Sequence, residues 1–456
     1  MIDLALAAFL FAWLALGLRR PFMWVLAYLY VDILAPQKIS YFLLAKLPVS
    51  LIVFVLAFGG WLLLDNKQDS RFAWRQGLIL VLLVYCGITT LGADFPVEAA
   101  DKWAWVWKAL VFAVFLPLTL RTRLRIEAAI LVMVLSVGAI IIDGGIKTLA
   151  SGGGYGELRL FVNDNTGLFE GSIISCVAIA TIPLLVWLAR HGTIFRPDWR
   201  AKLFALGLGF ACVLMPIGTQ ARTGLLCVGL LGVLSLRTVR NRFLYAGGLA
   251  LVLALAVPFL PDSFTARMST IENHQADQSA STRLAVWKWT LDYVKDHPFG
   301  GGFDSYRSNK LVIETRAAET TGNTTAVATQ TITDQGRAFH SSYFEMLGEQ
   351  GWPGLGLWLL LQASGLWQME LLRARWRRRA AQPGAGPEQE WQAPLANALQ
   401  QAQLVYLLGS TFVGIAFQPF ILMLIGLQCG LWTYCERIAA PRVERQARLR
   451  ATMRLG

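Results

Sequence analysis

Apolar stretches long enough to cross a lipid bilayer recur along almost the whole of this chain. A membrane-spanning helix needs roughly 20 mostly apolar residues, and such stretches run from residue 2 to residue 437. Charged residues make up only 15% of the sequence, which excludes an ordinary soluble enzyme because soluble domains carry about a quarter charged residues. Runs such as 78–91 do not alternate as the strands of an outer-membrane barrel would. The sequence therefore predicts an all-α, polytopic helical membrane protein.

About 12 transmembrane helices are expected, and 12 or 13 fit the pattern equally well. The apolar stretches cover residues 2–18, 22–36, 41–64, 77–93, 103–120, 126–146, 168–189, 203–219, 222–236, 243–260, 351–372, 399–417 and 419–436. The count is open near the N-terminus because 22–36 is short for a span, and Pro36 and Pro48 interrupt the next stretch. No small-residue cleavage site follows the first stretch, so we expect a retained helix rather than a signal peptide.

The segments that connect these stretches alternate between basic and weakly basic ones. Most of the 41 lysine and arginine residues gather in segments 19–20, 67–75, 121–125, 190–202, 237–242, 373–379 and 437–454. Positive residues favour cytoplasmic loops, so we expect these segments and the C-terminus to be cytoplasmic and the long segment 261–350 to lie on the other side. The net charge of +12 is thus mainly a topology signal, and we expect no nucleic-acid partner.

This alternation divides the chain into three parts. Residues 1–260 hold the N-terminal transmembrane helices, residues 261–350 form a large outer loop region with amphipathic helices, and residues 351–456 hold the C-terminal transmembrane helices and a basic tail. All six cysteines fall inside apolar stretches, without a CxxC pair. Neither a disulfide framework nor a zinc site is therefore predicted.

The outer loop contains one clear helical pattern, at residues 281–294. Leu284, Trp287, Leu291 and Val294 recur at helical spacing and form an apolar face. Arg283 lies in the first turn of this helix, where a cation opposes the helix dipole unless an anion binds beside it. The pattern therefore indicates an interfacial helix with a possible anion site at its start.

Arg222 lies in the tight hairpin 218–224, only a residue or two from apolar sequence on both sides. An arginine at that depth needs a partner. The Arg222 side chain could have a structural role, either reaching the membrane interface or pairing with a loop carboxylate. Alternatively, it could bind an anion. Gln220 and the threonines beside it supply further donors, which suits a phosphate.

His340, at the end of the outer loop, is the best candidate for a general base among the four histidines. Its imidazole, with an ordinary pKa near 6.5, can take a proton from a sugar hydroxyl near neutral pH. Tyr343 shares a helical face with it. The alternative is a capping or hydrogen-bonded histidine at a loop-to-membrane junction. The three glycines 300–302 could expose amides to a phosphate, although such a run is weak evidence alone.

Several motifs occur together in one order. They are Asn163-Asp-Asn-Thr-Gly167, Gln220-Ala-Arg-Thr-Gly224, Arg283 with Trp287, His297-Pro followed by glycines, and His340-Ser-Ser-Tyr-Phe-Glu-Met-Leu-Gly-Glu-Gln-Gly351. With these motifs the chain resembles the O-antigen ligase family of bacterial inner-membrane glycosyltransferases over about residues 160–370. That family also includes O-glycan polymerases and protein O-oligosaccharyltransferases. The resemblance implies a GT-C-like helical fold.

The resemblance also implies an activity: transfer of a preassembled glycan from undecaprenyl diphosphate to a hydroxyl of the lipid A core of lipopolysaccharide, at the periplasmic face. His340 would be the catalytic base, in an inverting reaction without a metal ion or other cofactor. The diphosphate would bind Arg222, Arg283, Arg159 and Arg337, and further substrate contacts would come from Asn163, Gln220 and Tyr343. The outer side has no Asp-x-Asp pair, so fixed positive charge would have to stabilise the leaving diphosphate.

Other functions remain open at this point. A polymerase of glycan repeats would use the same donor, but of the Arg-x10-Gly spacings typical of polymerases only Arg337 to Gly348 fits, and a single large outer loop favours a ligase. A protein O-oligosaccharyltransferase would often carry a soluble domain after the last span, where this chain has a short basic tail. A non-catalytic lipid flippase would often show repeat symmetry and mid-membrane charges, whereas here the polar residues crowd the outer side.

Overall fold

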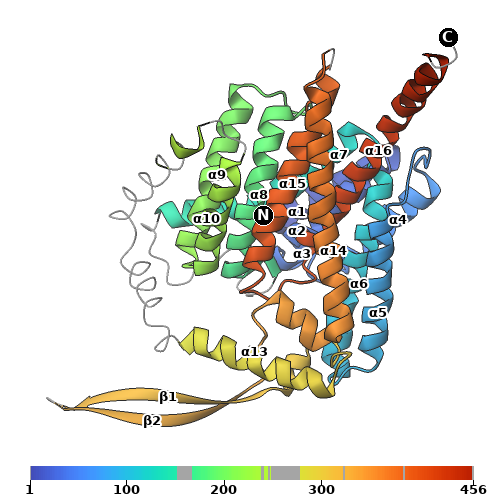
Figure 1. Ribbon diagram of the computed structural model, residues 1–456. Coiled ribbons are helices and arrows are strands. Elements are labelled where there is room, and N and C mark those ends of the chain that lie inside the picture. Colours follow the sequence, from blue (N-terminus) through green and yellow to red (C-terminus); the bar gives the residue numbers. More distant parts are fainter. Residues whose placement is uncertain are drawn as a thin grey trace.

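The computed structural model, in Figure 1, describes residues 2–150, 167–237, 241–244, 247, 278–321, 324–383 and 386–453. The first part of the chain forms α1 (Ile2–Arg19), α2 (Phe22–Leu34), α3 (Pro36–Ile39), α4 (Val49–Leu63), α5 (Trp74–Leu91), α6 (Pro96–Thr119) and α7 (Arg123–Ala150). The rest forms α8 (Gly171–His191), α9 (Trp199–Gly218), α10 (Arg222–Leu236), α13 (Gln278–Asp296), α14 (Ser342–Ala380), α15 (Gln392–Gly409) and α16 (Pro419–Met453). Most of these helices run side by side in one bundle (Figure 1).

The helices bear out the prediction of a helical membrane protein. Among the described residues, α5, α6, α7, α8, α9 and the Pro419–Ala439 part of α16 are long and apolar enough to cross a membrane. Three further apolar helices, α2, α4 and α10, are shorter. The chain is therefore a multi-pass membrane protein. The figure of about 12 spans stays a prediction, and the stretch 243–260 lies almost entirely outside the described residues.

The basic connections meet at one end of the bundle. Arg125, at the start of α7, pairs with Asp65 after α4 at 2.7 Å. Arg123 donates a hydrogen bond to the carbonyl oxygen of His191, the last residue of α8, at 2.9 Å. The C-terminal part of α16 leaves the bundle at this end, whereas α13 lies at the opposite end (Figure 1). The alternation of basic and weakly basic segments thus corresponds to two distinct ends of the molecule.

Polar side chains join helices inside the bundle, as is common where apolar surface alone gives no preference between helix and lipid. Arg75 is fully buried in α5, although the sequence grouped it with the basic connection before that helix. Its guanidinium donates to Gln428 at 3.0 Å, and Gln428 donates to Gln403 at 2.8 Å. Gln403 in turn donates to Gln362 at 2.7 Å. One buried chain of hydrogen bonds therefore ties α5, α16, α15 and α14 together.

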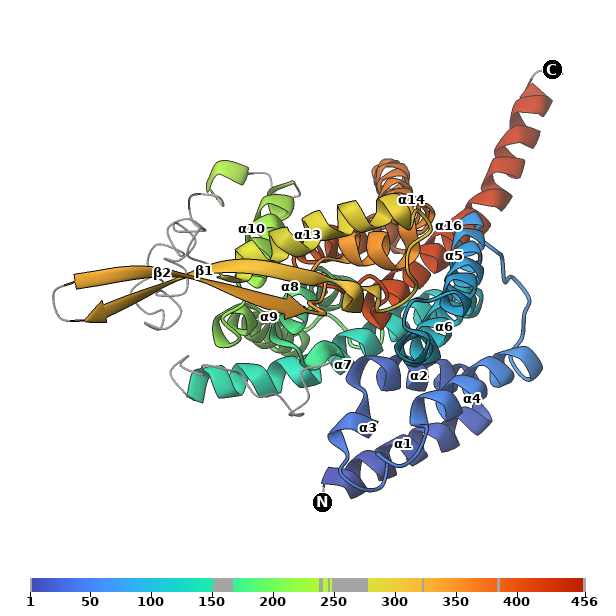
Figure 2. The same cartoon turned by 90° about the horizontal axis from the view of Figure 1, so that it is seen from below.

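The end of the bundle opposite the C-terminus carries a helix and a two-stranded hairpin. Viewed from that end, α13 lies across the ends of the bundle helices (Figure 2). The threonine-rich stretch after α13 forms the antiparallel strands β1 (Lys310–Thr321) and β2 (Thr324–Gln335). Threonine and the other β-branched residues of this stretch favour strands. The hairpin extends away from the bundle (Figures 1 and 2).

The amphipathic helix predicted at 281–294 is present as α13, but its packed face differs from the expected one. Leu284 and Leu291 are 62% and 44% exposed, so two members of the predicted apolar face point away from the protein. Val286, Thr290 and Val294 are buried instead. The helix packs on the start of α14 through a face that includes Thr290. The Thr290 hydroxyl donates a hydrogen bond to the Val286 carbonyl oxygen at 2.8 Å.

Candidate active site

His340 lines a cavity of about 360 Å³ at the end of the bundle where α13 lies. The cavity walls come from α6, the start of α8, the short helix Ser305–Ser308, the segment between β2 and α14, the start of α14 and the connection between α15 and α16. The lining residues are Lys102, Glu170, Ile173, Tyr306, Ala338, Phe339, His340, Glu345, Glu349, Val413 and Gly414. A histidine, three carboxylates and a phenol thus share one pocket, which suits a ligand rich in hydroxyl groups.

The α13 helix fixes the segment that carries His340. The indole Nε1 of Trp287 donates a hydrogen bond to the carbonyl oxygen of Phe339 at 2.9 Å. The same indole stacks on the ring of Phe344 with 4.9 Å between ring centres. Trp287 therefore holds the chain on both sides of His340. Arg283 lies one helical turn before Trp287, on the same side of α13.

The backbone of His340 adopts a left-handed conformation, with φ of 47°. Such a conformation is uncommon for a residue with a side chain and costs about 1 kcal/mol or more unless its surroundings impose it. The next residues provide that restraint: the Ser342 amide donates to the Ser410 carbonyl at 2.8 Å, and the Ser342 hydroxyl donates to the Val413 carbonyl at 3.0 Å. The ring of His340 is thereby directed by a fixed backbone.

Two arginines set the electrostatics around His340. Partial burial, and then the positive charges of Arg283 and Arg337, hold the pKa of the His340 imidazole below its usual value. A lowered pKa keeps the imidazole neutral near pH 7, and a neutral imidazole is the form that accepts a proton. Asn309 fixes the backbone of Arg337 by accepting from its amide at 3.0 Å and donating to its carbonyl at 2.7 Å. Arg283 and Arg337 are therefore near enough to His340 to act on its charge, and Arg337 also pairs with Asp334.

The hairpin with Gln220 and Arg222 lies at the neighbouring corner of the site. Gln220 is buried and left-handed, with φ of 52°, and Arg222 is the first residue of α10. The hydroxyls of Thr219 and Ser175 lie 2.7 Å apart, which joins the hairpin to the first turns of α8. Glu170, which caps α8 by accepting from the Ile173 amide at 2.8 Å, also lines the His340 cavity. The hairpin and the cavity therefore both contact the start of α8, although neither Gln220 nor Arg222 lines the cavity.

Three of the predicted site residues gain no support from the structure. Arg159 and Asn163 lie outside the described residues. Tyr343 does not line the cavity: its hydroxyl donates to the Leu407 carbonyl at 3.2 Å, and its ring packs against Trp358. These contacts give Tyr343 a place in the packing of α14 on α15. Its role in substrate binding stays a prediction.

The three glycines 300–302 do not offer their amides to a phosphate. The Gly301 and Gly302 amides donate to the carbonyl oxygens of Gly348 and Glu349, both at 3.0 Å. Gly302 and Gly351 have φ of 76° and 63°, which glycine adopts without strain. The run therefore allows close contact between the loop after α13 and the first part of α14. The idea of a phosphate site at these glycines was wrong.

Sequence reasoning missed the charged cluster below His340. The ammonium of Lys102, on α6, lies 2.8 Å from carboxylate oxygens of both Glu345 and Glu349 on α14, and 3.9 Å from Asp304. Glu349 also accepts from the Asp304 amide at 3.0 Å. The spacing of Glu345 and Glu349, one helical turn apart, indicated one face of a helix. Nothing in the sequence indicated that a lysine at the start of an apolar stretch would face them.

Among the residues that the structure describes, no three His, Cys, Asp or Glu side chains are grouped so that they could hold a metal ion. The charged cluster contains its own cation, Lys102, in the position between the carboxylates.

Two known families match parts of the chain. Residues 204–359 match the family described as O-antigen ligase, and residues 1–193 match a family of unknown function (DUF5935). No curated protein matches the chain. The chain is thus a membrane enzyme of the glycosyltransferase type, defined by its multi-pass helical fold and its ligase match. The segment that matches the O-antigen ligase family contains His340, Arg222, Arg283 and Arg337.

Proposed function

We propose that this chain is an O-antigen ligase that transfers a preassembled glycan from undecaprenyl diphosphate to a hydroxyl of the lipid A core. One observation carries the proposal: His340 lines a cavity, and partial burial and then the charges of Arg283 and Arg337 lower its pKa. A neutral base beside fixed positive charge is what a metal-free transfer to a hydroxyl requires. The match to the O-antigen ligase family supports this class of reaction.

The proposed reaction is a single displacement. The imidazole of His340 takes the proton of the acceptor hydroxyl while the hydroxyl oxygen attacks the anomeric carbon of the glycan. The bond between that carbon and the diphosphate oxygen breaks, and the lipid diphosphate leaves with its electron pair. The new glycosidic bond has the inverted configuration, and the imidazolium later returns its proton to water. No covalent enzyme intermediate is needed.

Arginine side chains would stabilise the charge that grows on the leaving diphosphate. Their guanidinium groups match phosphate geometry through paired donors and keep their charge at any physiological pH. Diphosphate contacts are proposed for Arg222, Arg283, Arg337 and Arg159, with Gln220 and Asn163 as further substrate contacts. What supports Arg222 and Gln220 is that their hairpin packs on the start of α8, which also lines the cavity.

The acceptor sugar would occupy the cavity itself. Glu170 and Glu345 present carboxylates that accept hydrogen bonds from sugar hydroxyls, and Tyr306 adds an aromatic surface. Lys102 pairs with Glu345 and compensates part of its charge. The cavity therefore suits a neutral or hydroxyl-rich sugar better than a strongly anionic one.

The orientation follows from the charge pattern. With the basic end in the cytoplasm, the cavity opens to the periplasm of a bacterial inner membrane and the C-terminus is cytoplasmic. In this arrangement residues 1–260 and 351–456 supply the membrane helices, and residues 261–350 form the periplasmic region that carries Arg283 and His340.

The test is transfer by the purified protein with undecaprenyl-diphosphate glycan as donor and lipid A core as acceptor, with and without a chelator. We expect the whole glycan to appear on the core, unaffected by the chelator. Lengthening of the lipid-linked glycan with the core untouched would make the protein a polymerase. Transfer only to an added protein acceptor would make it a protein O-oligosaccharyltransferase, and loss of transfer with the chelator would contradict the metal-free mechanism.

A further inference from the structure

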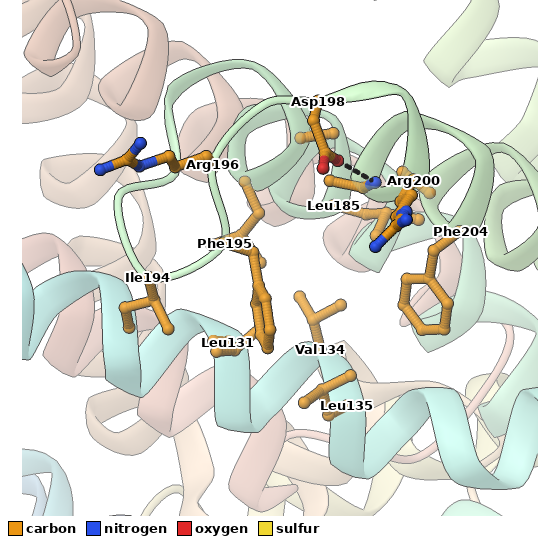
Figure 3. A pocket seen from close by; sticks show the side chains of 14 residues that line it. Leu131, Val134, Leu135, Leu185, Ile194, Phe195, Arg196, Asp198, Arg200 and Phe204 are labelled. Carbon is orange, nitrogen blue, oxygen red and sulfur yellow. Dashed lines mark hydrogen bonds between the residues drawn. The ribbon is translucent and has the colours of Figure 1, made fainter.

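A second cavity lies at the basic end of the bundle, far from His340 along the helices. It has a volume of about 530 Å³ and lies between α7, α8 and α9. Its walls are mainly apolar, with Leu131 and Leu135 from α7, Leu185 from α8 and Phe204 from α9. Figure 3 shows these side chains facing the cavity beneath the connection between α8 and α9.

The connection between α8 and α9, which covers this cavity, is held in place by hydrogen bonds. The connection 192–198 is fixed to α7 by the buried carboxylate of Glu127, which accepts from the amides of Thr193 and Ile194 at 2.5 and 2.6 Å. Asp198 caps α9 by accepting from the Ala201 amide at 2.8 Å. Both anions at the roof are thus engaged by backbone amides. The cavity is therefore held open by hydrogen bonds and does not depend on a loosely placed loop.

The mouth of the cavity carries exposed positive charge. The Arg200 side chain lies beside Phe204 at the cavity, whereas the Arg196 side chain points away from the cavity (Figure 3). In the described part of the chain neither arginine has a carboxylate partner in a salt bridge, and the Arg200 guanidinium lies 5.5 Å from the centre of the Trp199 ring. Trp199 is 69% exposed, as is common for tryptophan at a membrane interface. An anion at the mouth would therefore meet an unneutralised guanidinium.

The depth of the cavity fits a lipid chain. Leu135 lies about 12 Å along α7 from Glu127, the residue that holds the connection, at 1.5 Å per residue, and one leaflet contributes roughly 15 Å of hydrocarbon. The apolar walls thus reach from below the basic connection through most of one leaflet. A free phosphate would leave these walls uncovered, whereas an acyl chain would cover them.

We propose that this cavity binds an anionic phospholipid from the leaflet at the basic end, with one acyl chain between α7 and α9 and the phosphate at Arg200. Basic pockets between membrane helices at a cytoplasmic face bind anionic headgroups by the same attraction. The site is independent of the glycan transfer proposed for the opposite end. It would anchor the α8–α9 connection and set the lipid requirement of the purified protein.

The experiment is lipid binding to the purified, delipidated protein in detergent, followed by native mass spectrometry. The probes are dioleoyl phosphatidylglycerol and dioleoyl phosphatidylcholine, which share their acyl chains and differ in net charge. We expect phosphatidylglycerol to bind with higher affinity, and glycerol 3-phosphate not to displace it. Equal affinity for both lipids, or full displacement by glycerol 3-phosphate, would overturn the proposal.

Three variants locate the site. Arg200→Gln should weaken phosphatidylglycerol binding about fivefold, from the usual contribution of one arginine near a membrane surface, and leave phosphatidylcholine binding unchanged. Ala205→Trp, which fills the cavity, should weaken both lipids. Arg71→Gln removes an exposed arginine from another basic connection and should change neither. An equal effect of Arg71→Gln and Arg200→Gln would overturn the proposal, and this comparison decides it even if Ala205→Trp fails to fold.

Discussion

The indole of Trp287 donates a hydrogen bond to the carbonyl oxygen of Phe339, the residue that precedes His340, at 2.9 Å. This bond connects a helix that lies across the end of the bundle to the backbone of the proposed base. Because His340 has a left-handed backbone, the direction of its ring depends on such outside restraints. The position of the base is therefore a property of the contact between α13 and the start of α14.

Trp287→Phe tests this restraint. The variant keeps an aromatic ring on Phe344 and loses the hydrogen bond, which is worth about 1 kcal/mol. We expect the transfer rate to fall about fivefold to tenfold with only a small change in the thermal unfolding temperature. Trp289→Phe, at a tryptophan of the same helix that stacks on Tyr293, is the matched control and should keep the rate. Equal rates for the two variants would show that the hydrogen bond does not position the base.

The charged cluster predicts a large effect on stability. Lys102→Met leaves Glu349, whose side chain is 1% exposed, buried without its cation. Breaking a buried pair by removing one partner costs about 3 kcal/mol or more, so the unfolding temperature in detergent should fall sharply. Lys102→Met combined with Glu349→Gln should recover much of the loss, because the amide carries no charge. If the single variant unfolds at the wild-type temperature, the cluster does not stabilise the fold.

The pH dependence of transfer should report the charges around His340. Partial burial, and then the nearby cations, disfavour the imidazolium and lower the pKa of His340. Arg337→Gln removes one of these cations, so that pKa should rise and the acid limb of the rate profile should move to higher pH. Because Arg337 is 52% exposed, solvent screening keeps the shift to a few tenths of a pH unit. Arg71→Gln should leave the profile unchanged, and an acid limb that moves to lower pH in Arg337→Gln would contradict the assignment.

Gly351 gives a sharp test of how α14 meets the loop after α13. Its φ of 63° is left-handed, and a Cβ there would overlap the carbonyl oxygen of Pro298. Gly351→Ala should therefore destabilise the protein by about 2 kcal/mol or more. Gly356→Ala lies in the same helix with nothing within 4 Å of the added carbon, and it should be neutral or slightly stabilising. The measurement is the thermal unfolding temperature of the two variants. A Gly351→Ala protein as stable as Gly356→Ala would contradict the requirement for glycine at position 351.

The sequence predicted the helices well because apolar length and loop charge are local properties. The helix at 281–294 is a case of partial success: its extent followed from periodicity, but its packed face did not. Leu284 and Leu291 look like core residues in isolation and are exposed, while Thr290 is buried because α14 offers a surface there. Periodicity identifies a helix, and the partner surface decides which side is covered.

The candidate site shows the same division. His340, Arg283 and Arg337 could be proposed from residue type and place in the chain, and the two arginines are near enough to His340 to lower its pKa, after burial; their roles stay a prediction. The pairing of Lys102 could not be proposed from the sequence, because its partners on α14 lie more than two hundred residues away. Such a pairing depends on how two membrane helices pack, and no local pattern encodes it.

The most direct test of the account is the transfer rate of His340→Ala beside that of His297→Ala. Both histidines lie in the outer region, but His297 is exposed and stacks on Tyr293, with 4.2 Å between ring centres. If His340 is the base, His340→Ala should lose at least about a hundredfold in rate while its unfolding temperature is preserved, and His297→Ala should retain most of the wild-type rate. A folded His340→Ala protein that transfers glycan at a near-normal rate would contradict the central claim.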